Sequence, residues 1–154
     1  MNETAKLRYL EDLAVGQLFG SGSLTVDAEQ IVAFAKEFDP QPFHIDPEAA
    51  PGTFFRGLAA SGWHTAALTM RLLVEGETRL AGGIIGVSGE ISWPRPTRPG
   101  DTLTLESEVL EIVPSKSKPD RGMVTVRTTT YNQNREPVQV STMKLLAFRR
   151  PPAD

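Results

Sequence analysis

The chain has 154 residues, of which 40% are hydrophobic and 23% charged, and its formal net charge at pH 7 is −3. This composition is typical of a folded globular protein and argues against a general nucleic-acid binder, which would carry a basic surplus. The absence of cysteine excludes disulfides, thiolate zinc sites and cysteine nucleophiles. We expect a single domain over 1–154, with 1–10 and 149–154 peripheral or flexible. No apolar run is long enough for a transmembrane helix and no signal peptide is evident, so we expect a cytoplasmic protein.

The first predicted helix follows an extended lead-in over 17–25 and covers 27–38, with Asp27 as its N-cap. Apolar side chains recur in it at helical spacing and are expected to face the core: Ile31, Phe34, Ala35 and Phe38. Pro40 ends the helix, because the residue before a proline is disfavoured in the α conformation. Asp39 therefore lies at a helix C-terminus. A short helical turn is expected after Asp46.

The segment FDPQPFHID, residues 38–46, holds Asp39 and His44 five residues apart on a backbone stiffened by two prolines. Imidazole titrates near pH 6.5, so this carboxylate and imidazole can bind a water and move a proton at neutral pH. The same residue types are common in turns. From the spacing alone, a helix-terminating turn with an exposed histidine remains the alternative.

The second predicted helix begins at the capping residue Ser61 and ends before Gly76. Between Trp63 and Val74 its only charge is Arg71, and a helix that is apolar nearly all round is expected to be buried. The first backbone N–H groups of a helix lack intrahelical partners, so an N–H beside Gly62 could polarise a ligand carbonyl. An ordinary capped N-terminus is the alternative. Within the helix, His64 and Trp63 are interpreted as packing residues.

Four β-rich segments follow the helices, over 83–94, 101–113, 122–133 and 137–148. In the second segment the alternation predicts one buried face, made by Leu103, Leu105, Ser107 and Val109. Helices first and long strands afterwards predict an α+β fold, with an antiparallel sheet around the second helix.

Several kinds of site are not supported by the sequence. There is no glycine-rich phosphate loop that opens a helix, no histidine spacing typical of a metal site, and no G-x-S-x-G motif. Basic residues occur in two local clusters: Arg95 and Arg98, then Lys116, Lys118 and Arg121. They indicate either solvated loops or contacts to a small anionic ligand.

The segment FDPQPFHID resembles the hydratase motif of the MaoC-like acyl dehydratases, the (R)-specific enoyl-CoA hydratases, which is roughly D-x-N-P-[LIV]-H. Three further stretches are similar to the family's lead-in, central-helix entry and following strand break: YLEDLAVGQ, AASGWHTAAL and SWPRPTRPGD. The four motifs occur in the family's order, and the resemblance covers most of the chain.

The resemblance implies a single hotdog domain, in which a curved antiparallel sheet wraps a long central helix, and a homodimer or higher homo-oligomer. It also implies a hydro-lyase that acts on an acyl-CoA thioester, with Asp39 and His44 holding the water and the Gly62 N–H binding the thioester carbonyl. The candidate substrate-binding residues are Gln41 and Phe43, which replace the family's asparagine and small aliphatic residue, together with Trp63, Arg95 and Arg98. We expect no metal and no cofactor apart from CoA in the substrate, and neither nucleic acid nor a membrane as partner.

Two alternatives share this fold. A non-catalytic hotdog module would bind acyl thioesters without the Asp39 and His44 pair, which this chain keeps. A hotdog thioesterase would need a carboxylate on the central helix, and the stretch from Ser61 to Val74 contains neither Asp nor Glu.

Overall fold

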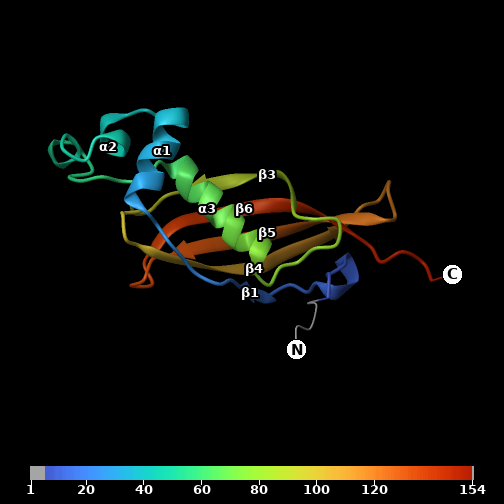
Figure 1. The fold of residues 1–154 in the computed structure, drawn as a ribbon. Coiled ribbons are helices and arrows are strands. Elements are labelled where there is room, and N and C mark those ends of the chain that lie inside the picture. Colours follow the sequence, from blue (N-terminus) through green and yellow to red (C-terminus); the bar gives the residue numbers. More distant parts are fainter. Residues whose placement is uncertain (1–5, 154) are drawn as a thin grey trace.

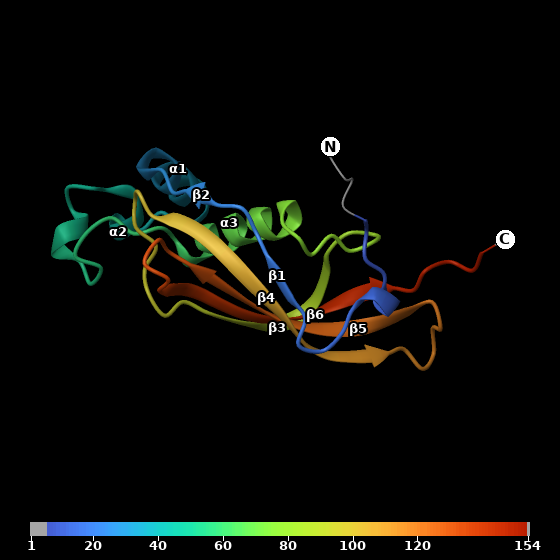
Figure 2. The same cartoon turned by 90° about the horizontal axis from the view of Figure 1, so that it is seen from below.

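The computed structural model describes residues 6–153, and one long helix lies across a six-stranded antiparallel sheet (Figures 1 and 2). The strand order is β1-β4-β5-β6-β3, with β2 paired to β4. The strands are β1 (Leu18–Gly20), β2 (Leu24–Thr25), β3 (Ile85–Ser92), β4 (Thr102–Pro114), β5 (Arg121–Tyr131) and β6 (Pro137–Phe148). The helices are α1 (Ala28–Phe38), α2 (Pro42–Ile45) and α3 (Gly62–Glu75), with short 3-10 turns at Leu10–Asp12 and Ala50–Gly52. The expected α+β class, strands and central helix are confirmed.

The inner face of the sheet follows the predicted alternation. Along β4 the buried side chains are Leu103, Leu105, Ser107 and Val109, as expected. One apolar cluster combines Leu10, Leu13, Phe19, Leu80, Val109, Val124, Val126, Leu145 and Ala147. Leu10, the last residue of the segment expected to be peripheral or flexible, belongs to this core. Residues 1–5 and 154 lie outside the described part of the chain.

Helix α1 begins where predicted, because the Asp27 carboxylate accepts a hydrogen bond from the Glu29 N–H at 2.7 Å. Ile31 and Ala35 are fully buried, but Phe38 is 64% exposed, so the prediction that Phe38 faces the core is wrong. Since α1 packs mainly on α2 and α3, only one narrow stripe of the helix is covered.

Helix α3 has the predicted ends, with Ser61 as N-cap and Gly76 as C-cap, but it is not buried all round. The sheet covers the side that carries Thr69, which bonds to Thr130 of β5, and Leu72, which packs with Leu103 and Leu105 of β4. The opposite side exposes Trp63, Ala67, Met70 and Val74, which recur at helical spacing and are called the apolar stripe below. In one copy of the chain, the sheet packs against one face of α3 only. Among residues 6–153, no helix is long and apolar enough to cross a membrane.

Candidate active site

The Asp39 and His44 side chains meet where α1 ends and α2 begins. Asp39 is the C-cap of α1, and Gln41 is the N-cap of α2. Pro42 is the first residue of α2, a position where its fixed φ suits a helix and its missing N–H costs nothing. The proline-rich segment is thus a short helix rather than a plain turn, and it buries His44 to 4% exposure. The alternative of an exposed turn histidine is wrong.

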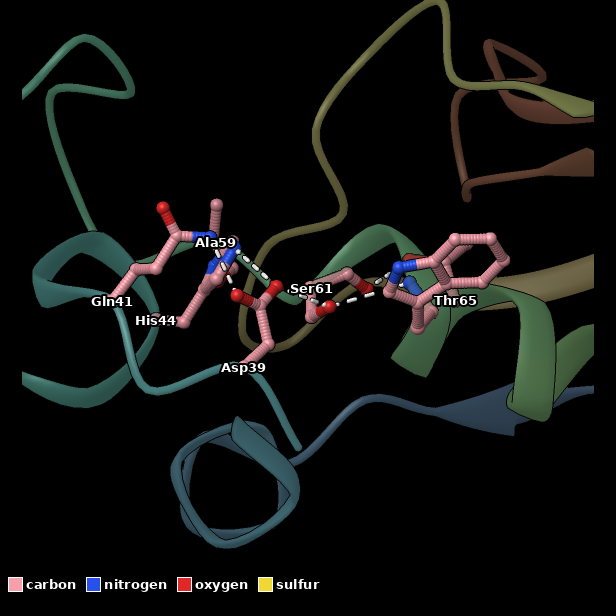
Figure 3. Close-up of polar contacts among 7 residues, drawn as sticks. Asp39, Gln41, His44, Ala59, Ser61 and Thr65 are labelled. Atoms are coloured by element: carbon pink, nitrogen blue, oxygen red, sulfur yellow. Dashed lines mark hydrogen bonds and ion pairs between the residues drawn. The ribbon is translucent and has the colours of Figure 1, made fainter. Parts of the chain in front are cut away.

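The hydrogen bonds of His44 define its tautomer. Its Nδ1 lies 2.6 Å from the carbonyl oxygen of Ala59, which can only accept, so Nδ1 carries the proton and donates. Its Nε2 lies 3.3 Å from Oδ2 of Asp39 (Figure 3). In the neutral ring Nε2 is an acceptor that faces a second acceptor. A water molecule that donates one proton to each atom satisfies both.

Two donors orient the Asp39 carboxylate. Its Oδ1 accepts from the side-chain amide of Gln41, and its Oδ2 accepts from Ser61 Oγ at 2.7 Å. Burial raises the pKa of Asp39, but the hydrogen bonds from Gln41 and Ser61, together with the positive charge that His44 carries when protonated, outweigh it and hold the pKa below the ordinary 3.8. Asp39 is therefore ionised at neutral pH and can accept a proton.

Ser61 joins this pair to the start of α3, and the sequence predicts only its capping role. Its side chain is fully buried, donates to Asp39 and accepts from the Trp63 N–H at 3.3 Å. Because Ser61 Oγ takes the N–H of Trp63, the N–H of Gly62 is left without an intrahelical acceptor.

A cavity of about 470 Å³ adjoins these groups. Its lining includes His44, Gly62, Thr65 and Trp93, and the others are Phe54, Phe55, Ala60, Pro94, Arg95, Pro96 and Thr97. A Cβ atom on Gly62 would lie 2.8 Å from Cε2 of Trp93, so the indole ring requires glycine at this position. The sequence indicates a glycine that lets a ligand approach, and Trp93 is the neighbour that it does not reveal.

The aromatic candidates lie on different sides of the site. Phe43 packs edge-on against the His44 ring, with centroids 4.5 Å apart, and also contacts Phe55. Trp63 is 61% exposed at the start of the apolar stripe and meets Trp93 edge-on at 5.4 Å. Phe43 therefore packs beside the Asp39–His44 pair, whereas Trp63 faces outward.

The basic candidates are separated by the fold. Arg95 lines the cavity, and its guanidinium pairs with Glu136 at 2.9 Å. The Arg98 guanidinium donates to the backbone carbonyls of Phe55, Gly57 and Leu58 and so fixes the segment before α3. Lys116, Lys118 and Arg121 lie at the β4–β5 turn, at the opposite end of the sheet from α2. Within residues 6–153, no three His, Asp or Glu side chains gather closely enough to hold a metal ion.

Comparisons with known proteins identify the family of this fold. Residues 13–132 match the family described as the MaoC like domain. The crystal structure of a MaoC-like dehydratase from Rhodospirillum rubrum superposes with a TM-score of 0.92 at 61% identity, covering 94% of this chain and 99% of that one. An (R)-specific enoyl-CoA hydratase of the same organism is 35% identical over 80% of this chain and 81% of its own length. The uncharacterized protein YdeM of Bacillus subtilis is 34% identical over 91% of this chain and 99% of its own. With its hotdog fold and this degree of similarity, the chain belongs to the MaoC-like dehydratase family.

Proposed function

We propose that the protein is an acyl-CoA hydratase or dehydratase, which adds or removes water across the 2,3 double bond of an enoyl thioester. Membership of the MaoC-like family supports hydratase chemistry in general. The observation that carries the specific proposal is the 3.3 Å approach of His44 Nε2 to Asp39 Oδ2, beside a cavity that also exposes the first turn of α3.

In the hydration direction, one water donates its protons to Asp39 Oδ2 and His44 Nε2. The pair removes one of these protons while the water oxygen bonds to the β-carbon of the enoyl thioester. The electrons of the double bond move toward the thioester carbonyl, whose developing negative charge accepts a hydrogen bond from the Gly62 N–H. A proton then passes from the pair to the α-carbon. Asp39 and His44 are coupled, so the proton is assigned to the pair and not to one residue.

The CoA part of the substrate can be bound by Arg95 at the cavity. Arg95 lies at the cavity and is 55% exposed, so its guanidinium can exchange its pairing with Glu136 for a phosphate of CoA. Arg98 is held by three backbone carbonyls, which assigns it to shaping the cavity wall.

We also infer a homodimer, because the apolar stripe of α3 adjoins an exposed edge strand. On β3, Ile85 is 39% and Val87 60% exposed, and one cavity is lined jointly by Met70 of α3 and Gly86 of β3. A second copy of the same surface would cover both elements. Light scattering of Met70→Asp should show monomers where the wild type forms dimers. A monomeric wild type would contradict this inference.

The activity is tested by hydration of crotonyl-CoA, followed as loss of the conjugated thioester absorbance. Asp39→Asn and His44→Ala should each lower kcat by about 10²–10⁴-fold, the usual contribution of a positioned acid or base. Asp46→Asn is the matched control, because this carboxylate lies in the same segment but caps the N–H groups of Glu48 and Ala49. Near-native rates in both variants would refute the assignment.

The same assay separates the alternatives. A folded wild type that binds acyl-CoA thioesters but hydrates none of a panel of enoyl-CoAs would be a binding module. Release of free CoA thiol would instead identify a thioesterase.

A further inference from the structure

Trp93 lines the candidate active-site cavity and contacts a residue that lines a second cavity. It follows β3, and its ring packs on Gly62 so closely that a Cβ atom there would lie within 3.0 Å of three ring atoms. On another side, its indole Nε1–H donates to Oε1 of Gln139 in β6 at 3.0 Å. The indole thus bridges the start of α3 and the sheet.

The second cavity, of about 170 Å³, lies between α3 and the sheet. Gln139, which is 2% exposed, lines it, whereas Trp93 lines the first cavity. Thr65 lines the first cavity and Thr69, about one helical turn further along α3, lines the second. The other residues lining the second cavity are Met70, Leu73, Ile84, Gly86, Ile91, Val126, Thr128, Ser141, Met143 and Leu145. The Trp93–Gln139 hydrogen bond therefore joins a residue that lines the first cavity to one that lines the second, and the two cavities follow each other along α3.

We propose that Trp93, fixed by Gln139, is the wall that ends the acyl site and restricts the protein to short acyl chains. This proposal rests on the proposed function and adds a specificity-determining residue to it. To let a longer chain pass, the indole must leave Gly62 and give up its bond to a buried amide, and a buried acceptor left without its partner is costly. The space behind it is large enough to be useful, since a cavity of about 150 Å³ can hold a benzene molecule.

The test uses two readouts on the full chain: calorimetric binding of butyryl-CoA and octanoyl-CoA, and hydration of crotonyl-CoA and 2-octenoyl-CoA. The wild type should favour the four-carbon thioester in both. Each buried methylene strengthens binding by about fourfold. Trp93→Ala should therefore shift the eight-to-four-carbon ratio by at least about tenfold toward octanoyl-CoA.

Two further variants distinguish an opened wall from a loosened protein. Trp93→Phe keeps a flat ring against Gly62 and should retain most of the short-chain preference. Ser141→Leu fills the second cavity, so in the Trp93→Ala background it should abolish the gain for octanoyl-CoA while butyryl-CoA still binds. Retained butyryl-CoA binding also shows that each variant is folded. If Trp93→Ala does not fold, Gln139→Leu takes its place, and it should shift the ratio in the same direction by a smaller factor.

The outcomes separate the two proposals. A wild type that hydrates four- and eight-carbon substrates equally, or a Trp93→Ala ratio that does not change, overturns the wall while the hydratase stands. Butyryl-CoA could bind selectively without any hydration, and Trp93→Ala could reverse this binding preference. That result would support Trp93 as the end of the acyl site and refute the hydratase proposal. A gain for octanoyl-CoA that persists when Ser141→Leu fills the cavity overturns the wall. Binding of no acyl-CoA at all overturns both proposals.

Discussion

The inner face of the sheet has two halves with the same alternation, and only one of them carries a group of buried polar side chains. Toward the β4–β5 turn, β5 and β6 present Val124, Val126, Leu145 and Ala147 to the core. Toward the candidate active site, Leu103 and Leu105 of β4 are still apolar, but they lie beside a group of buried polar residues on β4, β5 and β6: Ser107, Thr128, Thr130, Gln139 and Ser141. We call these the apolar half and the polar half.

Four of the five polar side chains in the polar half, Ser107, Thr128, Thr130 and Gln139, make hydrogen bonds that cross between elements. Ser107 pairs with Thr128 at 2.7 Å, and Thr69 of α3 pairs with Thr130 at 2.7 Å. Buried hydroxyls without partners would be costly, so these pairs hold α3 and the strands in one register. The apolar half therefore supplies stability, whereas the polar half positions the helix whose first turn enters the candidate site.

The largest stability effect is expected in the apolar half. Phe19 is 3% exposed within this core and lies on β1, and Phe→Ala changes in cores cost about 3–5 kcal/mol. Phe19→Ala should lower the free energy of unfolding by this amount, measured by urea denaturation. The kcat per folded molecule should stay unchanged. A large loss of kcat in fully folded protein would show that the two halves are not separate in function.

In the polar half, replacing one hydroxyl of a bonded pair should lower the free energy of unfolding more than replacing both. Thr130→Val leaves Thr69 Oγ1 buried without its partner and should cost about 1–3 kcal/mol. The double variant Thr69→Val with Thr130→Val removes both hydroxyls and should recover most of this loss. Urea denaturation of the wild type, the two single variants and the double variant measures the coupling free energy between Thr69 and Thr130. Additive losses would mean that the pair does not hold the register.

Ser61 connects the polar half to catalysis. Ser61→Ala removes an N-cap and should cost about 1 kcal/mol of stability. It also removes a donor to Asp39, so the pKa of Asp39 should rise and the acid limb of the pH–rate profile should move to higher pH. Ionised Asp39 stabilises the fold above pH 3.8, and this contribution is lost as the pH falls through the folded pKa. The variant should weaken this contribution. Ser61→Thr keeps a hydroxyl and should restore the profile, whereas an unchanged acid limb in Ser61→Ala would contradict the role.

His64 should produce the smallest effect, visible as a pH dependence of stability. Its ring stacks on Phe34 at 4.7 Å, and among the described residues its buried Nδ1 has no hydrogen-bond partner. Burial lowers the pKa of His64 below 6.5. Below pH 6.5 the unfolded chain therefore binds a proton that the folded chain resists, and stability falls as the pH decreases. The contribution of His64 to the slope of the unfolding free energy against pH cannot exceed about 1.4 kcal/mol per pH unit.

Thermal unfolding between pH 5 and 8 tests this for His64→Phe, which keeps a ring against Phe34. The variant should lose less stability than the wild type as the pH decreases from 6.5 to 5. The other histidine, His44, is the same in both proteins, so the difference between them reports on His64. Equal slopes for wild type and His64→Phe would contradict the assignment.

Local patterns predicted the elements well, because caps, prolines and alternation act within a few residues. Asp27, Ser61 and Gly76 mark helix ends in the sequence and in the structure. The side of α3 that carries Trp63 and Met70 was predicted less well, because apolar residues all round a helix do not reveal whether a sheet or another copy of the chain covers each side.

Only the part of the candidate site that lies within a few residues of sequence could be predicted. Asp39 and His44 are near in sequence and stiffened by prolines, so their proximity could be anticipated. The second bond of Ser61 and the position of Trp93 join segments that are 22 and 46 residues apart, respectively. Contacts of that separation depend on how α1, α3 and the sheet pack, which no local pattern specifies. Gln41 departs from the family motif, yet its amide binds Asp39, a contact that depends on the turn between α1 and α2.

The most direct test of the account is a double-mutant cycle on the catalytic pair, measured as kcat for crotonyl-CoA hydration. Because Asp39 and His44 are proposed to act on one water, the losses should not multiply. Asp39→Asn with His44→Ala should be about as slow as the slower single variant. Losses that multiply across the cycle would show that the two residues act independently, and they would contradict the shared water.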